Sequence, residues 1–221
     1  MDERPRLAYH YCMKPKIRPK KGDVTPIADF LYEVGMLAKT PRSGFFFLGS
    51  GVQSVAEHIT RTTYVGYVLA MLSNRSGVPA DEAKVIKMCL FHDLGEARTS
   101  DLNYVNQKYA KASEHEAVND LAKLLPFGKD IVASFHEFED RKTYEAQLAK
   151  DADQLELILS LREQSDIGNT RANSWLPNAT KRLKTAVAKQ VVEAILKTES
   201  DHWHFAEKND GWWVHRNGLK S

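Results

Sequence analysis

Two helices joined by a tight turn are the strongest constraint on how this chain folds. Ser54-Val55-Ala56-Glu57 matches a capping box, in which the serine and glutamate side chains satisfy free N–H groups at a helix start. The helix that begins there is expected to run to about Asn74, where Gly77-Val78-Pro79 follows. Apolar residues at helical spacing predict a second helix from Asp81 to Leu90. So short a connection predicts an antiparallel pair of helices.

The same periodicity predicts helices along most of the remaining chain. One is expected to begin with Thr25 as N-cap and Pro26 at the first helical position, and to end near Lys39. Polar residues, glycine and proline predict loops at two places, and apolar periodicity predicts four more helices. The expected loops are 39–47 and 166–178, and the expected helices are 106–125, 129–139, 143–164 and 179–197.

The composition is that of an ordinary globular protein. The chain has 221 residues, enough for one sizeable domain or two small ones, and a formal net charge of +2. That charge gives no strong attraction to nucleic acid or to acidic membranes. No apolar run approaches the roughly 20 residues that span a bilayer, and no signal peptide is evident. We therefore expect a cytoplasmic enzyme or binding protein, with no membrane and no nucleic-acid partner.

The segment Phe91-His92-Asp93-Leu94-Gly95-Glu96 carries the chemistry. An imidazole and a carboxylate stand side by side, and Glu96 follows within one helical turn of both. Imidazole and carboxylate groups are ligands for a divalent ion, and a second carboxylate nearby can handle water. Neighbours on a helix point about 100° apart. His92 and Asp93 can therefore share an ion only off the helix end or in a cleft against other helices.

Two other helices offer further ligands. His58 lies in the first turn of the helix that starts at Ser54, where a histidine is either a ligand or an ordinary surface or core residue. Asp153 borders the apolar stripe of its helix, so its side chain can point into the bundle. A buried carboxylate there requires a cation nearby, because an unpaired buried charge is costly. Asp151 and Glu156 are expected to be solvated. His115 and His136 are weaker candidates for a second metal ion, since no carboxylate stands beside either at ligand spacing.

Two loop residues have both a functional and an ordinary interpretation. Arg42, in a turn, either binds a phosphate or is simply a solvated arginine. Asp101 either contacts a substrate hydroxyl or the outer shell of the site, or merely caps a turn. The spacing of the residues does not separate these alternatives.

The two ends of the chain differ in character from the middle. Residues 1–22 form a basic arm with seven basic and two acidic residues, either a plain surface arm or one that attracts phosphate-bearing substrate or a partner subunit. Residues 201–221 form a tail rich in tryptophan and histidine. We expect the tail to pack on the domain or on a partner subunit, with a histidine-rich metal site as the alternative.

The order His58, then His92-Asp93, then Asp153 resembles the H…HD…D signature of the HD-domain metal-dependent phosphohydrolases. The residues around these positions, including Leu94-Gly95-Glu96 and Asp101-Leu102, look like those of the 5′-deoxynucleotidase group within that superfamily. The resemblance covers roughly residues 25–197. One departure is that Phe45 and Phe46 stand where relatives often carry a tryptophan that helps to read the sugar.

The resemblance implies an all-α fold, a single-domain HD-domain helical bundle over residues 23–200 with a metal site between helices. It implies one divalent transition metal ion (Co, Mn, Fe, Ni or Zn, with Mg as an alternative) held by His58, His92, Asp93 and Asp153. Glu96 would position or deprotonate the attacking water, Arg42 would hold the 5′-phosphate, and Asp101 would lie near the sugar or the water. Family members are commonly homodimers.

The activity implied is removal of the 5′-phosphate from (deoxy)ribonucleoside 5′-monophosphates. The alternative within the superfamily is a nucleotide phosphodiesterase, or a phosphohydrolase of (d)NTPs or alarmones. A second alternative is a non-catalytic, metal-stabilised binding module, for which Glu96 and Asp101 would not be needed.

Overall fold

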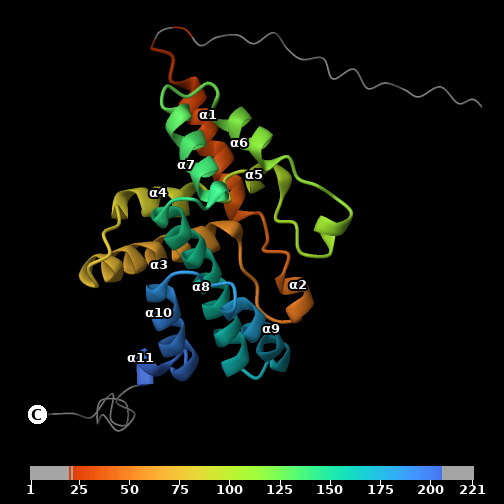
Figure 1. The fold of residues 1–221 in the computed structure, drawn as a ribbon. Coiled ribbons are helices and arrows are strands. Elements are labelled where there is room, and N and C mark those ends of the chain that lie inside the picture. The colour runs from red at the N-terminus through yellow and green to blue at the C-terminus, as the bar shows by residue number, and fades with distance from the viewer. Residues whose placement is uncertain (1–19, 21, 206–221) are drawn as a thin grey trace, which may run out of the picture.

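The computed structural model describes residues 20 and 22–205, and this part of the chain is helical (Figure 1). A single isolated β-bridge joins Pro41 to Ser54 within it. The elements are α1 (Thr25–Val34), η1 (Gly35–Ala38), α2 (Phe45–Leu48), α3 (Val55–Arg75), α4 (Glu82–Phe91), α5 (Glu96–Thr99), η2 (Asn106–Lys108), α6 (Glu114–Ala122), α7 (Gly128–Asp140), α8 (Tyr144–Asp166), α9 (Thr170–Thr180), α10 (Ala186–Lys197) and α11 (His202–Phe205). The prediction of an all-α fold is confirmed.

The helix pair predicted from the capping box is present as α3 and α4. The Ser54 hydroxyl accepts a hydrogen bond from the Glu57 backbone N–H at 3.2 Å, and the Ser54 backbone N–H donates to the Glu57 carboxylate at 2.6 Å. The helices approach closely at Gly66, where a Cβ atom would lie 2.6 Å from the Cys89 sulfur. A side chain there would push α4 away from α3.

Helix α8 lies at the centre of the bundle and packs against α3, α4, α7, α9 and α10 (Figure 1). Its start is capped by the Thr143 hydroxyl, which accepts from the Ala146 N–H at 3.2 Å. The expectation that Asp151 is solvated is wrong. Asp151 is buried and accepts hydrogen bonds from the backbone N–H groups of Lys184 and Thr185, at 2.7–3.1 Å. It thereby ties α8 to the start of α10.

Four other expectations about the helices need correction. The predicted helix over 106–125 is interrupted, because only η2 and α6 are helical there, and Tyr109 between them is 87% exposed. The predicted loop over 166–178 contains most of α9, which Asn169 caps and which buries Ala172 and Ala179. The helix expected over 179–197 begins only at Ala186, and α1 begins one residue earlier than expected, with Val24 as N-cap.

The buried apolar side chains form two clusters, and each contains residues near the predicted ligands in the sequence. The larger cluster includes Cys89 of α4 and Ala152 of α8. The smaller includes Val55 and Ile59, which flank His58 along α3. Both clusters are close-packed against the elements that carry the predicted ligands, so the positions of these elements are fixed by the core.

Most of residues 1–22 and 201–221 lies outside the described residues, so the predicted arm and tail are untested. In α11, Trp203 is 81% exposed. No helix in the described part of the chain is long and apolar enough to cross a membrane.

Candidate metal centre and active site

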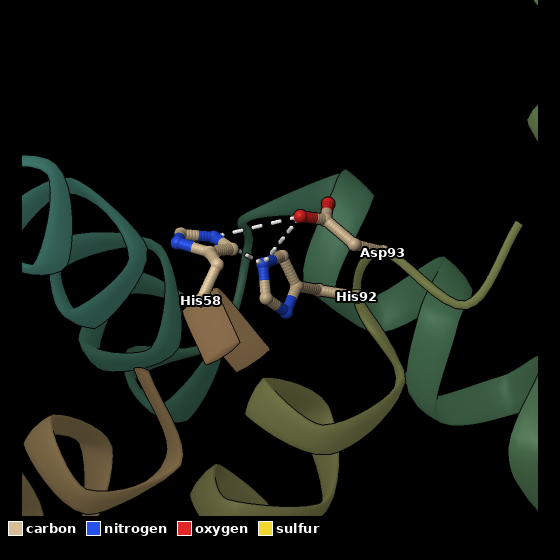
Figure 2. A group of neighbouring side chains, drawn as sticks. All are labelled: His58, His92 and Asp93. Atoms are coloured by element: carbon tan, nitrogen blue, oxygen red, sulfur yellow. Dashed lines mark hydrogen bonds and ion pairs between the residues drawn. The ribbon is translucent and has the colours of Figure 1, made fainter. Parts of the chain in front are cut away.

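The structure brings the four predicted metal ligands together from three helices. His58 is on α3, His92 and Asp93 directly follow α4, and Asp153 is on α8. The His58 Nε2 atom lies 3.2 Å from His92 Nε2, 3.5 Å from an Asp93 oxygen and 3.2 Å from an Asp153 oxygen. Figure 2 shows the two imidazole rings and the Asp93 carboxylate converging on one point. Asp153 is farther from His92, at 4.0 Å.

Both imidazole rings are held with Nε2 directed at this point. The Nδ1 atom of His92 lies 2.8 Å from the Cys89 carbonyl oxygen, which can only accept, so Nδ1 carries the proton. The Nδ1 atom of His58 lies 2.5 Å from a Glu156 oxygen. Because each Nδ1 is engaged, each Nε2 is left to face the other ring and the carboxylates. Two inward-facing imidazole nitrogens with two carboxylates are a donor set that fits a divalent transition metal ion.

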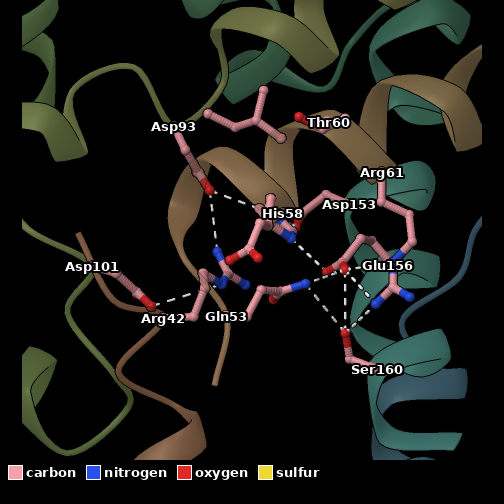
Figure 3. A network of polar contacts seen from close by, with 12 residues as sticks. Arg42, Gln53, His58, Thr60, Arg61, Asp93, Asp101, Asp153, Glu156 and Ser160 are labelled. Atoms are coloured by element: carbon pink, nitrogen blue, oxygen red, sulfur yellow. Dashed lines mark hydrogen bonds and ion pairs between the residues drawn. The ribbon is translucent and has the colours of Figure 1, made fainter. Parts of the chain in front are cut away.

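Glu156 was expected to be solvated, and the structure shows the opposite. Its side chain is buried, and Figure 3 shows it enclosed by polar groups. One oxygen contacts His58, and the other accepts from the Arg61 guanidinium at 2.8 and 2.9 Å and from the Gln53 amide at 2.7 Å. Ser160 donates to this second oxygen at 3.2 Å. Periodicity missed this buried partner of His58, although Glu156 lies one turn from Ala152 on the buried stripe.

The charges around His58 set the protonation of this pair. Burial opposes an ionised Glu156, but hydrogen bonding and attraction from His58 and the charge of Arg61 outweigh it and lower the pKa of Glu156 to about 2. Burial and the charge of Arg42 oppose a protonated His58. Hydrogen bonds to Asp153 and Glu156 outweigh both and raise the pKa of His58 to about 9 when no cation is present. Glu156 is therefore an anion at neutral pH.

Arg42 reaches the site from the turn before α2, held between two aspartates (Figure 3). Its Nη1 atom lies 3.2 Å from an Asp93 oxygen and its Nε atom 3.8 Å from an Asp101 oxygen. Asp101 also accepts from the backbone N–H of Ser43 at 2.8 Å. The structure thus places Arg42 beside a predicted ligand and makes Asp101 the residue that fixes the arginine turn.

Glu96, at the start of α5, is buried and has one unpartnered oxygen. No hydrogen-bond donor among the described residues contacts its Oε2 atom. Burial, with the nearby charges of Asp93 and Asp101, raises the pKa of Glu96 to about 10 in the absence of a cation. Such a carboxyl group is placed to exchange a proton with a ligand beside the centre.

The comparisons with known proteins agree with this geometry. The model of the HD domain family matches residues 34–195. The chain belongs to the HD domain family. It is 33% identical to the 5′-deoxynucleotidase HDDC2 of Dictyostelium discoideum over 61% of this chain and 75% of that protein. The human 5′-deoxynucleotidase HDDC2 is 27% identical over 64% of this chain and 69% of its own length.

Solved structures share the fold of this HD-domain protein. A conserved hypothetical protein from Pyrococcus furiosus superposes with a TM-score of 0.67 at 29% identity, covering 77% of this chain and 99% of its own. An HD-domain phosphohydrolase from Listeria innocua has a TM-score of 0.62 at 13% identity, over 82% and 97% of the two chains. The resemblance found in the sequence is confirmed. Membership of the family implies a divalent metal ion, and the His-His-Asp cluster is a potential site for it.

The metal centre opens into a cavity of about 900 Å³. Asp93, Asp153, Glu96, Arg42 and Asp101 all line it, so every predicted site residue except the two buried histidines borders the same space. That volume is within the range of pockets that bind small molecules.

The second pair of histidines lies elsewhere. The Nδ1 atoms of His115 and His136 are 3.1 Å apart on the surface. Within residues 20 and 22–205, no third histidine, cysteine or acidic side chain completes a metal-binding group with them. In the described part of the chain, the structure therefore provides no further ligand that would support the weak prediction of a second metal ion at this pair.

Proposed function

We propose that this HD-domain protein is a metal-dependent phosphohydrolase that removes the 5′-phosphate from (deoxy)ribonucleoside 5′-monophosphates. The observation that carries the proposal is that Arg42, Glu96 and Asp101 border one cavity with the two predicted carboxylate ligands of the metal. A module that used metal for stability alone would not need a buried, unpartnered carboxyl group and a fixed arginine beside it. The 5′-deoxynucleotidase relatives support the nucleoside monophosphate as substrate.

His58, His92, Asp93 and Asp153 would hold one divalent ion. Neutral imidazoles with carboxylates favour Co, Mn, Fe, Ni or Zn, with Mg as an alternative. When bound, such an ion lowers the pKa of a water molecule and polarises a phosphoryl oxygen. Glu156 keeps His58 oriented for this role, and the Cys89 carbonyl does the same for His92.

The remaining residues bind the phosphate and move the proton. Arg42 would pair with the phosphoryl oxygens and neutralise their charge. Glu96 would accept the proton of the attacking water as its oxygen bonds to phosphorus. The bond between phosphorus and O5′ then breaks, O5′ takes up the proton from Glu96, and the products are the nucleoside and inorganic phosphate. Asp101 would hold Arg42 and its turn in place.

The test is phosphate release from a panel of ribo- and deoxyribonucleoside 5′-monophosphates, using metal-stripped protein with Co, Mn, Mg and Zn returned singly. Release should require metal and be confined to 5′-monophosphates, and the panel should reveal the sugar preference that Phe45 and Phe46 leave open. His92→Ala should abolish release, whereas His136→Ala, a histidine outside the site, should leave it intact.

Other outcomes would favour the rival functions. If phosphate were released only from cyclic nucleotides, (d)NTPs or alarmones, the protein would be a phosphohydrolase of that class and not a monophosphatase. No release with any metal, together with salt-dependent binding of nucleic acid, would favour a binding module. The homodimer, the cytoplasmic location and the absence of a nucleic-acid partner stay predictions from the sequence.

A further inference from the structure

Four basic side chains line the cavity away from the metal ligands. Arg141 follows the end of α7, and Lys181, Arg182 and Lys184 lie between α9 and α10. We call these four residues the basic wall. The predicted ligands and Arg42 come from other segments of the chain, so two separate groups of charges share one cavity.

The basic wall differs from the other cations of the cavity in having no acidic partner. Arg42 pairs with Asp93 at 3.2 Å, and Lys150 pairs with Asp153 at 2.9 Å. Within the described chain, no carboxylate lies within ion-pair distance of the Arg141, Lys181, Arg182 or Lys184 side chains, which are exposed. Four uncompensated positive charges around one cavity attract an anion.

A buried amide on the same cavity also lacks a partner. The Nε2 atom of Gln154 is buried and has no hydrogen-bond acceptor among the described residues. Gln154 lines the cavity on the face of α8 that also presents Gln147 and Lys150, at helical spacing. An unsatisfied buried donor is costly and calls for an explanation. An oxygen of a bound ligand would supply the missing acceptor.

We propose that the basic wall binds a second phosphate group of the substrate, carried on the sugar away from the phosphate that is removed. The substrate class is then nucleotides with a 5′-monophosphate and a further phosphate at the 3′ position. This inference rests on the proposed function, because Arg42 and the metal ligands are already assigned to the 5′-phosphate. Water adds to the 5′-phosphorus and the bond to O5′ breaks as before, while the second phosphate is unchanged.

The direct test compares deoxyadenosine 5′-monophosphate with deoxyadenosine 3′,5′-bisphosphate. The bisphosphate should have a kcat/KM about tenfold higher, the size expected of one hydrogen bond to a charged group. A 5′-phosphorylated dinucleotide, whose second phosphate is a bridging diester, tells whether a terminal phosphate is required. Equal kcat/KM values for the monophosphate and both other substrates would overturn the proposal.

Matched variants separate a binding site from general electrostatic attraction. The double variant Arg182→Ala/Lys184→Ala should lose most of the preference for the bisphosphate. Lys189→Ala/Lys197→Ala removes the same charge from exposed positions of α10 outside the cavity, and should keep the preference. If both double variants lower kcat/KM equally for both substrates, the cations act only by long-range attraction and the inference fails.

Calorimetry measures binding of the bisphosphate to metal-stripped full-length protein without any hydrolysis. It therefore tests the basic wall separately from the proposed phosphohydrolase activity. Loss of binding in Arg182→Ala/Lys184→Ala, but not in Lys189→Ala/Lys197→Ala, would support the basic wall even if no monophosphate were hydrolysed with any metal. Unchanged binding in both double variants would overturn it even if monophosphates were good substrates.

Discussion

Glu96 and Glu156 are both buried glutamates beside the predicted metal ligands, and their surroundings are opposite. Glu156 has hydrogen-bond partners on both oxygens, among them His58 and Arg61, and its pKa is lowered to about 2. Glu96 has an oxygen with no partner in the described residues and faces the charges of Asp93 and Asp101, and its pKa is raised to about 10. One group is fixed as an anion and the other retains a proton.

The difference indicates that the two glutamates have different roles. An oxygen that already accepts several hydrogen bonds cannot also accept a proton from water, so Glu156 is suited to orienting His58. A carboxyl group with a free oxygen at the cavity can exchange a proton. A cation at the centre would offset the nearby negative charges and let Glu96 ionise. The comparison can be tested at each glutamate separately.

The largest effect is expected from Glu96→Gln. Removal of a general base should lower kcat by about 10²- to 10⁴-fold. The metal content, measured by elemental analysis, should stay that of the unaltered protein, because Glu96 is not a predicted ligand. Glu193→Gln, an exposed glutamate of α10 outside the site, is the control and should leave kcat and metal content nearly unchanged. Full activity in Glu96→Gln would remove it from the mechanism.

Glu156→Gln should act on the metal instead. Loss of the carboxylate behind His58 should weaken metal affinity by about 10- to 100-fold, the range for partners of metal ligands. The affinity is measured by competition with a chelating dye. At saturating metal most of kcat should return, which would not happen if Glu156 took part in proton transfer. Unaltered affinity would show that His58 needs no support.

The smallest effect concerns stability of the metal-free protein as pH changes. Glu156, with its folded pKa near 2 and a usual value of 4.5, stabilises the fold above pH 4.5, and this is lost as pH falls toward 2. By the linkage relation the loss is at most about 3 kcal/mol. Glu96 has a folded pKa near 10, so its protonated form stabilises the fold. That stabilisation is complete below pH 4.5 and is lost as pH rises toward 10.

Urea unfolding of chelator-treated protein across this pH range measures both effects. Glu156→Gln should flatten the acid side of the stability profile, and Glu96→Gln should flatten the alkaline side. The same change of profile in both variants would show that the two carboxyl groups do not differ as the structure indicates.

The sequence predicted the scaffold of the site well, because local signals specify it. The capping box at Ser54 and the turn before α4 set the helix pair, and the apolar stripe of α8 placed Asp153 at its edge. These signals depend only on residues close in the sequence. The same is true of the spacing between His92, Asp93 and Glu96.

The misses share one physical cause, which is burial set by distant parts of the chain. Asp151 and Glu156 were expected to be solvated. The helix is instead surrounded by others, and Glu156 meets Arg61 and Gln53 from much earlier in the sequence. Helix α9 was missed because polar residues, glycine and proline suggested a loop, whereas Asn169 caps the helix and the core buries Ala172.

The central position of α8 has a consequence for the order in which the site assembles. His58 and His92 are 34 residues apart and sit on one helix pair, whereas Glu156 follows His58 by 98 residues. Closing a contact over a longer separation costs more loop entropy, which favours contacts between nearby segments early in folding. During synthesis or refolding His58, His92 and Asp93 therefore meet before Asp153 and Glu156 of α8 arrive. Metal that reaches the chain early encounters three of the four predicted ligands, and the docking of α8 is the step that adds Asp153.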